Sequence, residues 1–417
     1  VRYVSHGTGI GSGLSSSGKT TIDISGGTVK ATGSGDGYKG SAGIGSGSYS
    51  TGDTSITLRD GVTVTATGGG NSSLGGGGGA GIGSGSDANG NTTILIEGAA
   101  KVTATGGSTA AGIGSGHYVG DINDPSVGST TITIRNSDDG RVIPIIEAKG
   151  GSNENGSCWA SGAGIGSGGN TLNKTTINIE GGEITATGGV SLDSRNHSDE
   201  RLSGGGIGSG SNVSGETEIN IKGGTITKVT GGKYGGAGSG SGSSDTKDDS
   251  KKGAVTINIT DGTIEKAEGK NGGAGIGSGY YGRSSTVNIS GNAELKDVRG
   301  GNLAAGIGSG YDSDKVDVVI DGGTINATGG DSAAGIGSGL NSRSSVTIKS
   351  GTVNAKGNQH SNNFGSSGIG GSYADVTISG GTITATGYAT GAGIGGSDNN
   401  NSSSITIPGG PNTAPGT

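Results

Sequence analysis

Tyrosine is the most frequent aromatic residue of this chain, and several tyrosines recur at one place relative to a repeated motif. The motif is Ala-Gly-Ile-Gly-Ser-Gly or a close copy, and these tyrosines follow its isoleucine by four or five residues. They are Tyr49, Tyr118, Tyr280, Tyr281, Tyr311 and Tyr373. A tyrosine ring offers an apolar face and a polar tip, which suits stacking on sugar rings or on a partner protein. We therefore predict a ligand-binding edge; the alternative is that each ring only covers its own loop.

Polar residues in the related loops add oxygens but no catalytic group. Asp87, Asp312 and Asn341 follow the motif in other copies and offer acceptors for sugar hydroxyl groups. The four histidines are scattered, and no two have the spacing of metal ligands. The acidic clusters at 121–124 and 312–314 match no EF-hand loop, so solvated loops are favoured and a structural calcium is the alternative. We predict no catalytic residue, no metal site and no cofactor.

Composition excludes several classes of protein. A hydrophobic fraction of 27% is too small for several large globular cores, yet the regular spacing of the apolar residues argues against disorder. No segment approaches the roughly twenty apolar residues of a membrane helix, so we predict no membrane insertion. The net charge of −7 argues against a nucleic-acid partner. Cys158 is the single cysteine, which excludes a disulfide within the chain.

Short strands must position the tyrosines. Segments such as 20–33 (TTIDISGGTVKATG) alternate apolar and polar residues with period two and turn at a Gly pair. In this unit we expect five side chains to point inward, namely Ile22, Ile24, Val29, Ala31 and Ile44. Four should point outward, namely Asp23, Thr28, Lys30 and Thr32. One unit cannot bury its apolar face alone, but stacked units can.

The repeat spacing predicts an all-β, right-handed parallel β-helix (a β-solenoid) of about twelve coils of roughly thirty residues each. The motif's central residue is isoleucine in every copy but one, where we place Ala237. We expect residues 1–407 to form one domain, with an insertion at 121–160 and a C-terminal linker at 408–417. The insertion holds Trp159 beside Cys158, and Trp159 is a further candidate ligand contact or a cap on a wider core.

Two outward surfaces also follow from the repeat. Glycines alternate along the Gly-Ile-Gly-Ser-Gly strand, which predicts a flat, bare face suited to self-association. Rows of outward threonines, such as Thr382, Thr384 and Thr386, raise the alternative of ice binding. Charged residues at equivalent positions, among them Lys30 and Glu183, break that regular array, so strand propensity explains the threonines better.

The pattern of GGTINATGG at 322–330 and AAGIGSG at 333–339 resembles the Gly-rich repeat regions of Gram-positive bacterial cell-surface proteins. Those regions resemble pectate-lyase-like parallel β-helices, and the resemblance covers this chain from Gly9 to about Ile407. It implies a secreted, extracellular or cell-surface adhesin that binds carbohydrate, a host surface or a partner surface protein. The wider β-helix group includes polysaccharide lyases and glycosidases, but no catalytic Arg, Lys or acid pair of theirs can be aligned here.

We therefore expect a non-enzymatic binding or adhesive solenoid that uses the tyrosine-bearing edge. One alternative is a structural stalk or self-assembly element without a small ligand. Another is a carbohydrate-active enzyme, a polysaccharide lyase or a glycosidase, whose acids lie on adjacent coils and so form no linear motif.

Overall fold

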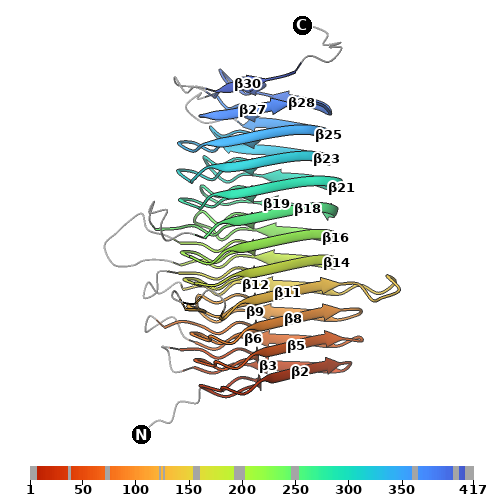
Figure 1. Ribbon diagram of the computed structural model, residues 1–417, viewed down its shortest axis with the longest axis vertical. Coiled ribbons are helices and arrows are strands. Elements are labelled where there is room, and N and C mark those ends of the chain that lie inside the picture. The colour runs from red at the N-terminus through yellow and green to blue at the C-terminus, as the bar shows by residue number, and fades with distance from the viewer. Residues whose placement is uncertain are drawn as a thin grey trace.

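The chain forms a rod of stacked coils in the computed structural model (Figure 1). The structure describes residues 7–35, 39–70, 76–121, 124, 127–153, 160–191, 202–245, 253–358, 365–397 and 403–408. These residues form strands and turns and no helix, so none of them supplies an apolar helix that could cross a membrane. The all-β architecture with parallel strands confirms the predicted fold class and agrees with a right-handed parallel β-helix.

One sheet consists of a two-residue strand from each of twelve coils, and all its strands are parallel. The strands are β1 (Ile10–Gly11), β4 (Ile44–Gly45), β7 (Ile82–Gly83), β10 (Ile113–Gly114), β13 (Ile165–Gly166), β15 (Ile207–Gly208), β17 (Ser239–Gly240), β20 (Ile276–Gly277), β22 (Ile307–Gly308), β24 (Ile336–Gly337), β26 (Ile369–Gly370) and β29 (Ile394–Gly395). We number the coils one to twelve by these strands. The placement of Ala237 as a central residue was wrong, because Ser239 pairs with Ile207 and Ile276.

The remaining strands, most of them longer, form an eighteen-stranded parallel sheet. They are β2 (Thr20–Ser25), β3 (Thr28–Thr32), β5 (Thr54–Arg59), β6 (Thr63–Thr67), β8 (Thr92–Glu97), β9 (Lys101–Thr105), β11 (Thr130–Arg135), β12 (Ile145–Lys149), β14 (Thr175–Thr187), β16 (Thr217–Thr230), β18 (Val255–Ile264), β19 (Ala267–Glu268), β21 (Ser285–Arg299), β23 (Val316–Asp331), β25 (Ser344–Asn358), β27 (Ala374–Ile378), β28 (Thr382–Thr386) and β30 (Ser404–Thr406). Near the N-terminal end a Gly corner separates two strands in each coil, whereas β14 and β16 run through the corner.

The interior is a set of apolar columns that run along the rod. Ile22, Ala31 and Ile44 are buried as expected, and the four predicted outward side chains of this unit are exposed. Ile24 and Val29 are only partly buried because their coil is at the N-terminal end of the described stack and is covered on one side. Alternation with period two therefore assigned the inner and outer faces of the first unit correctly.

Two constraints favour glycine as the second residue of the short strands: a positive φ in all twelve, and a backbone clash in the eleven on which a further short strand is stacked. Its φ lies between +118° and +138° in all twelve strands, a conformation that side-chain-bearing residues rarely adopt. A Cβ at Gly45 would also overlap the carbonyl oxygen of Gly83 on the next coil. The close stacking of these backbones thus excludes any side chain at this position.

The predicted flat glycine face is wrong as an exposed surface. Gly43, Gly45 and Gly47 are buried, and a Cβ at Gly43 would lie within 2.9 Å of backbone atoms of Thr67 and Gly81. Within the stack, these glycines admit the protein's own backbone and therefore do not present a bare face to another chain. Self-association stays a prediction, but it would need a different surface.

The predicted insertion at 121–160 is not one irregular loop. It contains β11 and β12, which pair in register with β8 and β9 of the preceding coil. A long corner at residues 136–144 joins them and projects from the rod (yellow in Figure 1). The regular strands were missed because this corner replaces the usual Gly pair.

Candidate functional site

A turn follows each short strand, and one of its residues has a left-handed backbone in ten coils, with φ from 46° to 58°. We call these residues the edge column: Ser15, Tyr49, Asp87, Tyr118, Asn170, Asn212, Tyr281, Asp312, Asn341 and Tyr373. In eight of them, all but Asn341 and Tyr373, the backbone amide donates to a carbonyl one coil on, as from Tyr49 to Ser86 (3.0 Å) and from Tyr118 to Gly169 (3.1 Å). These hydrogen bonds align the turns along one edge of the rod.

Tyrosine is an unexpected residue in this column. Asn and Asp tolerate a left-handed backbone better than other side chains, and they fill five of the ten positions. Tyrosine has no such preference, yet it occurs at four. Three of these rings are also largely open to solvent, with exposed fractions of 45% for Tyr49, 48% for Tyr118 and 46% for Tyr373. Neither backbone preference nor core packing explains these three rings.

The other predicted tyrosines form a closed cluster. The ring centroids of Tyr280 and Tyr281 lie 4.1 Å apart, and those of Tyr280 and Tyr311 lie 5.4 Å apart, both stacked. Burial and a hydrogen bond with Tyr281 raise the pKa of Tyr280. These rings cover one another, which leaves less ring face for a ligand than at Tyr49 or Tyr118.

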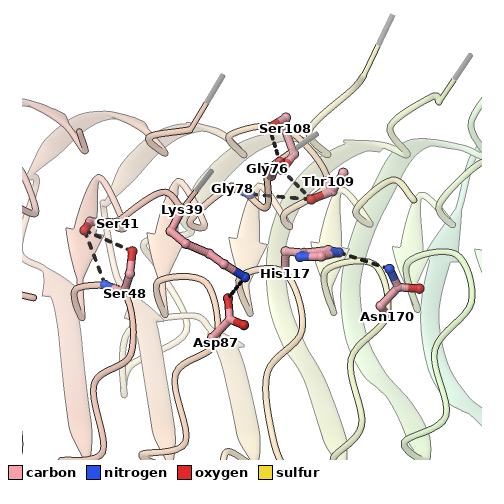
Figure 2. Close-up of polar contacts among 10 residues, drawn as sticks. All are labelled: Lys39, Ser41, Ser48, Gly76, Gly78, Asp87, Ser108, Thr109, His117 and Asn170. Carbon is pink, nitrogen blue, oxygen red and sulfur yellow. Dashed lines mark hydrogen bonds and ion pairs between the residues drawn. The ribbon is translucent and has the colours of Figure 1, made fainter. Parts of the chain in front are cut away.

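A row of polar side chains runs along this edge from the second coil to the fifth (Figure 2). Lys39 reaches across to the third coil, where its Nζ lies 2.7 Å from Oδ2 of Asp87. The same Nζ lies 5.7 Å from the ring centroid of Tyr49. Figure 2 shows His117 and Asn170 continuing this row across the fourth and fifth coils, with 3.0 Å between His117 Nε2 and Asn170 Nδ2.

His117 is held in its neutral form. As the amide is oriented, Asn170 donates to Nε2, so the ring proton belongs on Nδ1. Part of the side chain reaches the surface, but Nδ1 is buried without a hydrogen-bond partner. Burial, with a smaller contribution from the positive charge of Lys39, lowers the pKa of His117 to about 3. At neutral pH the ring therefore adds no charge to the edge.

Loop hydroxyl groups support this part of the edge. Ser108 Oγ donates to the carbonyl of Gly76 (3.2 Å), and the amide of Gly78 donates to Thr109 Oγ1 (3.5 Å). A Cβ on Gly77 would overlap the His117 ring, so the loop backbone packs directly on the imidazole. The site is thus preorganised by its own loops.

The long corner at 136–144 forms a second candidate surface. Ser137 Oγ donates to Asp139 (2.6 Å), and the amide of Val142 donates to Ser137 Oγ (3.1 Å). Val142, Ile143 and Ile145 are exposed, and Ile145 lines a hollow of about 180 Å³. The hollow is lined by Lys101, Val102, Thr103, Ile145, Ile146, Glu147, Glu183 and Thr185.

The structure brings together only part of what the sequence suggested. Tyr49 and Tyr118 lie on either side of Asp87, Tyr373 lies at the far end of the edge column, and Trp159 and Cys158 lie outside the described residues. Within the described ranges, no three His, Cys, Asp or Glu side chains are grouped as a metal site.

Sequence reasoning missed Lys39, His117 and Asn170. Aligning the turns would have found the last two, because they follow their isoleucines by four and five residues.

Comparison with known proteins supports the repeat and no more. The beta helix repeat family matches residues 22–48, 94–117, 177–211, 257–280, 318–340, 346–373 and 376–398. No curated protein and no solved structure matches the chain. The matched segments run from the first coil to the last and follow the observed strands. The chain therefore folds as a parallel β-helix, and seven of its segments are similar to the beta helix repeat family.

Proposed function

We propose that this solenoid is a non-enzymatic binding or adhesive protein that contacts a glycan, or the glycan-bearing surface of a host or partner, through its edge column. One observation carries the proposal: Tyr49, Tyr118 and Tyr373 are open to solvent at backbone positions that disfavour tyrosine. Exposed aromatic rings on a preorganised backbone bind at little entropic cost. Such a protein would act outside the cell, either secreted or at the cell surface.

A glycan panel tests the proposal. The purified chain and the double variant Tyr49→Ala/Tyr118→Ala are applied to soluble neutral, acidic and amino-sugar polysaccharides, and the mass of each glycan is measured afterwards. We expect the wild type to bind at least one class without changing its mass, and the variant to bind about tenfold or more weakly. If the double variant bound as tightly as the wild type, the edge column would not be the binding surface. If nothing bound, the structural stalk would be the better account.

Polysaccharide cleavage is the second candidate, and the hollow beside the long corner favours it. Glu147 and Glu183 line the hollow from adjacent coils. Ile145 is the residue that pairs with Glu183, so Glu147 lies two residues further along its strand. Two carboxylates on one groove are what glycoside hydrolysis requires. A shortened glycan after incubation with the wild type, but not with Glu147→Gln, would favour this function over simple binding.

A further inference from the structure

We infer that the edge between Tyr49 and Tyr118 takes an uncharged polysaccharide that lies parallel to the axis of the rod. This inference rests on the proposed function, and it adds the class of the ligand and its direction. Both follow from the two open tyrosines and from the polar row of Lys39, Asp87, His117 and Asn170, which Figure 2 shows.

The direction follows from the stacking of the coils. Tyr49 and Tyr118 occupy the same turn position in the second and fourth coils, and Asp87 occupies it in the coil between. At about 4.8 Å per coil, the two tyrosine backbones are about 10 Å apart along the rod. Asn170 continues the column in the fifth coil. A chain laid along the rod meets a ring, a carboxylate, a ring and an amide in turn.

The absence of ligand charge follows from the electrostatics of the row. The positive charge of Lys39 is compensated by Asp87 at 2.7 Å, and both side chains are largely shielded, with exposed fractions of 26% and 21%. His117 is neutral because burial lowers its pKa to about 3. The loop after Tyr118 carries Asp121 and Asp124, and the whole chain has a net charge of −7. In the described part of this row, an anionic glycan would therefore meet carboxylates and a lysine that already faces one.

The remaining polar atoms suit hydroxyl groups. A carboxylate has about four acceptor sites, so Asp87 retains acceptors after pairing with Lys39. The Asn170 amide offers both a donor and an acceptor. Sugar hydroxyls both donate and accept, and the apolar faces of sugar rings can stack on Tyr49 and Tyr118. An uncharged, hydroxyl-rich chain can use Asp87, Asn170 and the two tyrosine rings without leaving a ligand charge unpaired.

Calorimetric titrations at low and high salt test this inference. The probes are a soluble neutral glucan, a soluble neutral mannan and polygalacturonate. We expect the wild type to bind a neutral probe at least tenfold more tightly than polygalacturonate, with an affinity that hardly changes with salt. Tighter, salt-sensitive binding of polygalacturonate would overturn the inference but leave the proposed binding function intact. Binding of none of the probes would overturn the inference, and the broader glycan panel would then decide whether the proposed binding function stands.

Asp87→Asn provides the reciprocal test, because it removes the carboxylate that faces Lys39. This variant should gain about tenfold in affinity for polygalacturonate at low salt and lose the gain at high salt. Asp312→Asn is the matched control. Asp312 occupies the same turn position as Asp87, but its coil lies five coils beyond the coil of Tyr118. No gain for Asp87→Asn, or an equal gain for Asp312→Asn, would show that the Lys39–Asp87 pair does not set the ligand's charge. The comparison of neutral and acidic probes on the wild type stands even if a variant fails to fold.

Discussion

The Nζ of Lys39 lies 2.7 Å from Oδ2 of Asp87, so a residue that precedes the second short strand is tied to the turn that follows the third. Both side chains are partly buried, whereas the side chains of the Lys222–Glu180 pair, on the eighteen-stranded sheet, are more exposed to solvent. Partial burial reduces solvent screening and strengthens an ion pair.

We predict a coupling of about 1 kcal/mol between Lys39 and Asp87, and less than half of that between Lys222 and Glu180. Double-mutant cycles measured by urea unfolding, with Lys→Met and acid→amide substitutions, give both values. The Lys39–Asp87 coupling should decrease as salt is added. Equal couplings for the two pairs would mean that the burial of the edge pair has no energetic effect.

The buried His117 should make stability depend on pH. Its pKa is lowered from 6.5 to about 3 in the folded protein, so the unfolded chain takes up a proton first as the pH falls. The free energy of unfolding should therefore decrease below about pH 6.5. Between about pH 6 and about pH 4, the wild type should lose about 2 kcal/mol more than His117→Gln. The other histidines are common to both proteins, so parallel pH profiles would show that His117 titrates normally.

The Ile-Gly glycines should be irreplaceable, and three substitutions separate the reasons. Gly83→Ala adds a Cβ that overlaps the Gly114 carbonyl at a φ of +137°, and we expect a loss of about 4 kcal/mol or failure to fold. Gly61→Ala has a φ of +78° but open space, so it should cost about 1 kcal/mol. Gly18→Ala has neither constraint and should be within about 0.5 kcal/mol of wild type. Thermal midpoints rank the three variants, and a mild effect at Gly83 would contradict the close stacking.

Ser239 is the serine in a column that otherwise holds isoleucine. It is buried, and its hydroxyl has no hydrogen-bond partner. Ser209 is equally buried, but its Oγ accepts from the amide of Gly242 at 3.1 Å. Ser239→Ala should therefore leave the free energy of unfolding unchanged or raise it by up to about 1 kcal/mol, whereas Ser209→Ala should lower it by about 1 kcal/mol. A larger loss in the free energy of unfolding for Ser239→Ala than for Ser209→Ala would mean that the Ser239 hydroxyl has a hydrogen-bond partner in solution.

Strict alternation of apolar and polar residues made the coils and their inner faces predictable. The effect of a one-residue difference in the length of a turn could not be predicted in this way. Arg283 and Arg343 both precede two serines, yet Arg283 is 4% exposed and Arg343 is exposed. In the sheet, Ser285 and Ser344 both pair with Val316, so Arg283 stands two residues before the aligned serine and Arg343 one. A shift of one residue turns a strand side chain to the other face.

The buried Arg283 donates to the carbonyls of Gly215 (2.7 Å) and Gly253 (2.6 Å), and burial lowers its pKa to about 9. No local pattern indicates such a contact across coils.

The candidate site was predictable to a similar degree. The spacing from the isoleucines placed the tyrosines on one edge, because the turns align when the coils stack. Which rings are open depends on the neighbouring coil: Tyr280 meets Tyr311, whereas the turn next to Tyr49 carries Ser86 and Asp87. Lys39 reaches the site from a different loop through a long side chain, and its partner depends on loop geometry that a sequence does not specify.

The most direct test of the binding account compares an open tyrosine with a stacked one. Isothermal titration of a glycan that binds the wild type is repeated with Tyr118→Ala and with Tyr281→Ala, after circular dichroism has shown both to be folded. The account predicts a loss of about tenfold or more in affinity for Tyr118→Ala and less than about twofold for Tyr281→Ala. Unchanged affinity for Tyr118→Ala, or an equal loss for both variants, would contradict the claim that the open rings of the edge column bind the ligand.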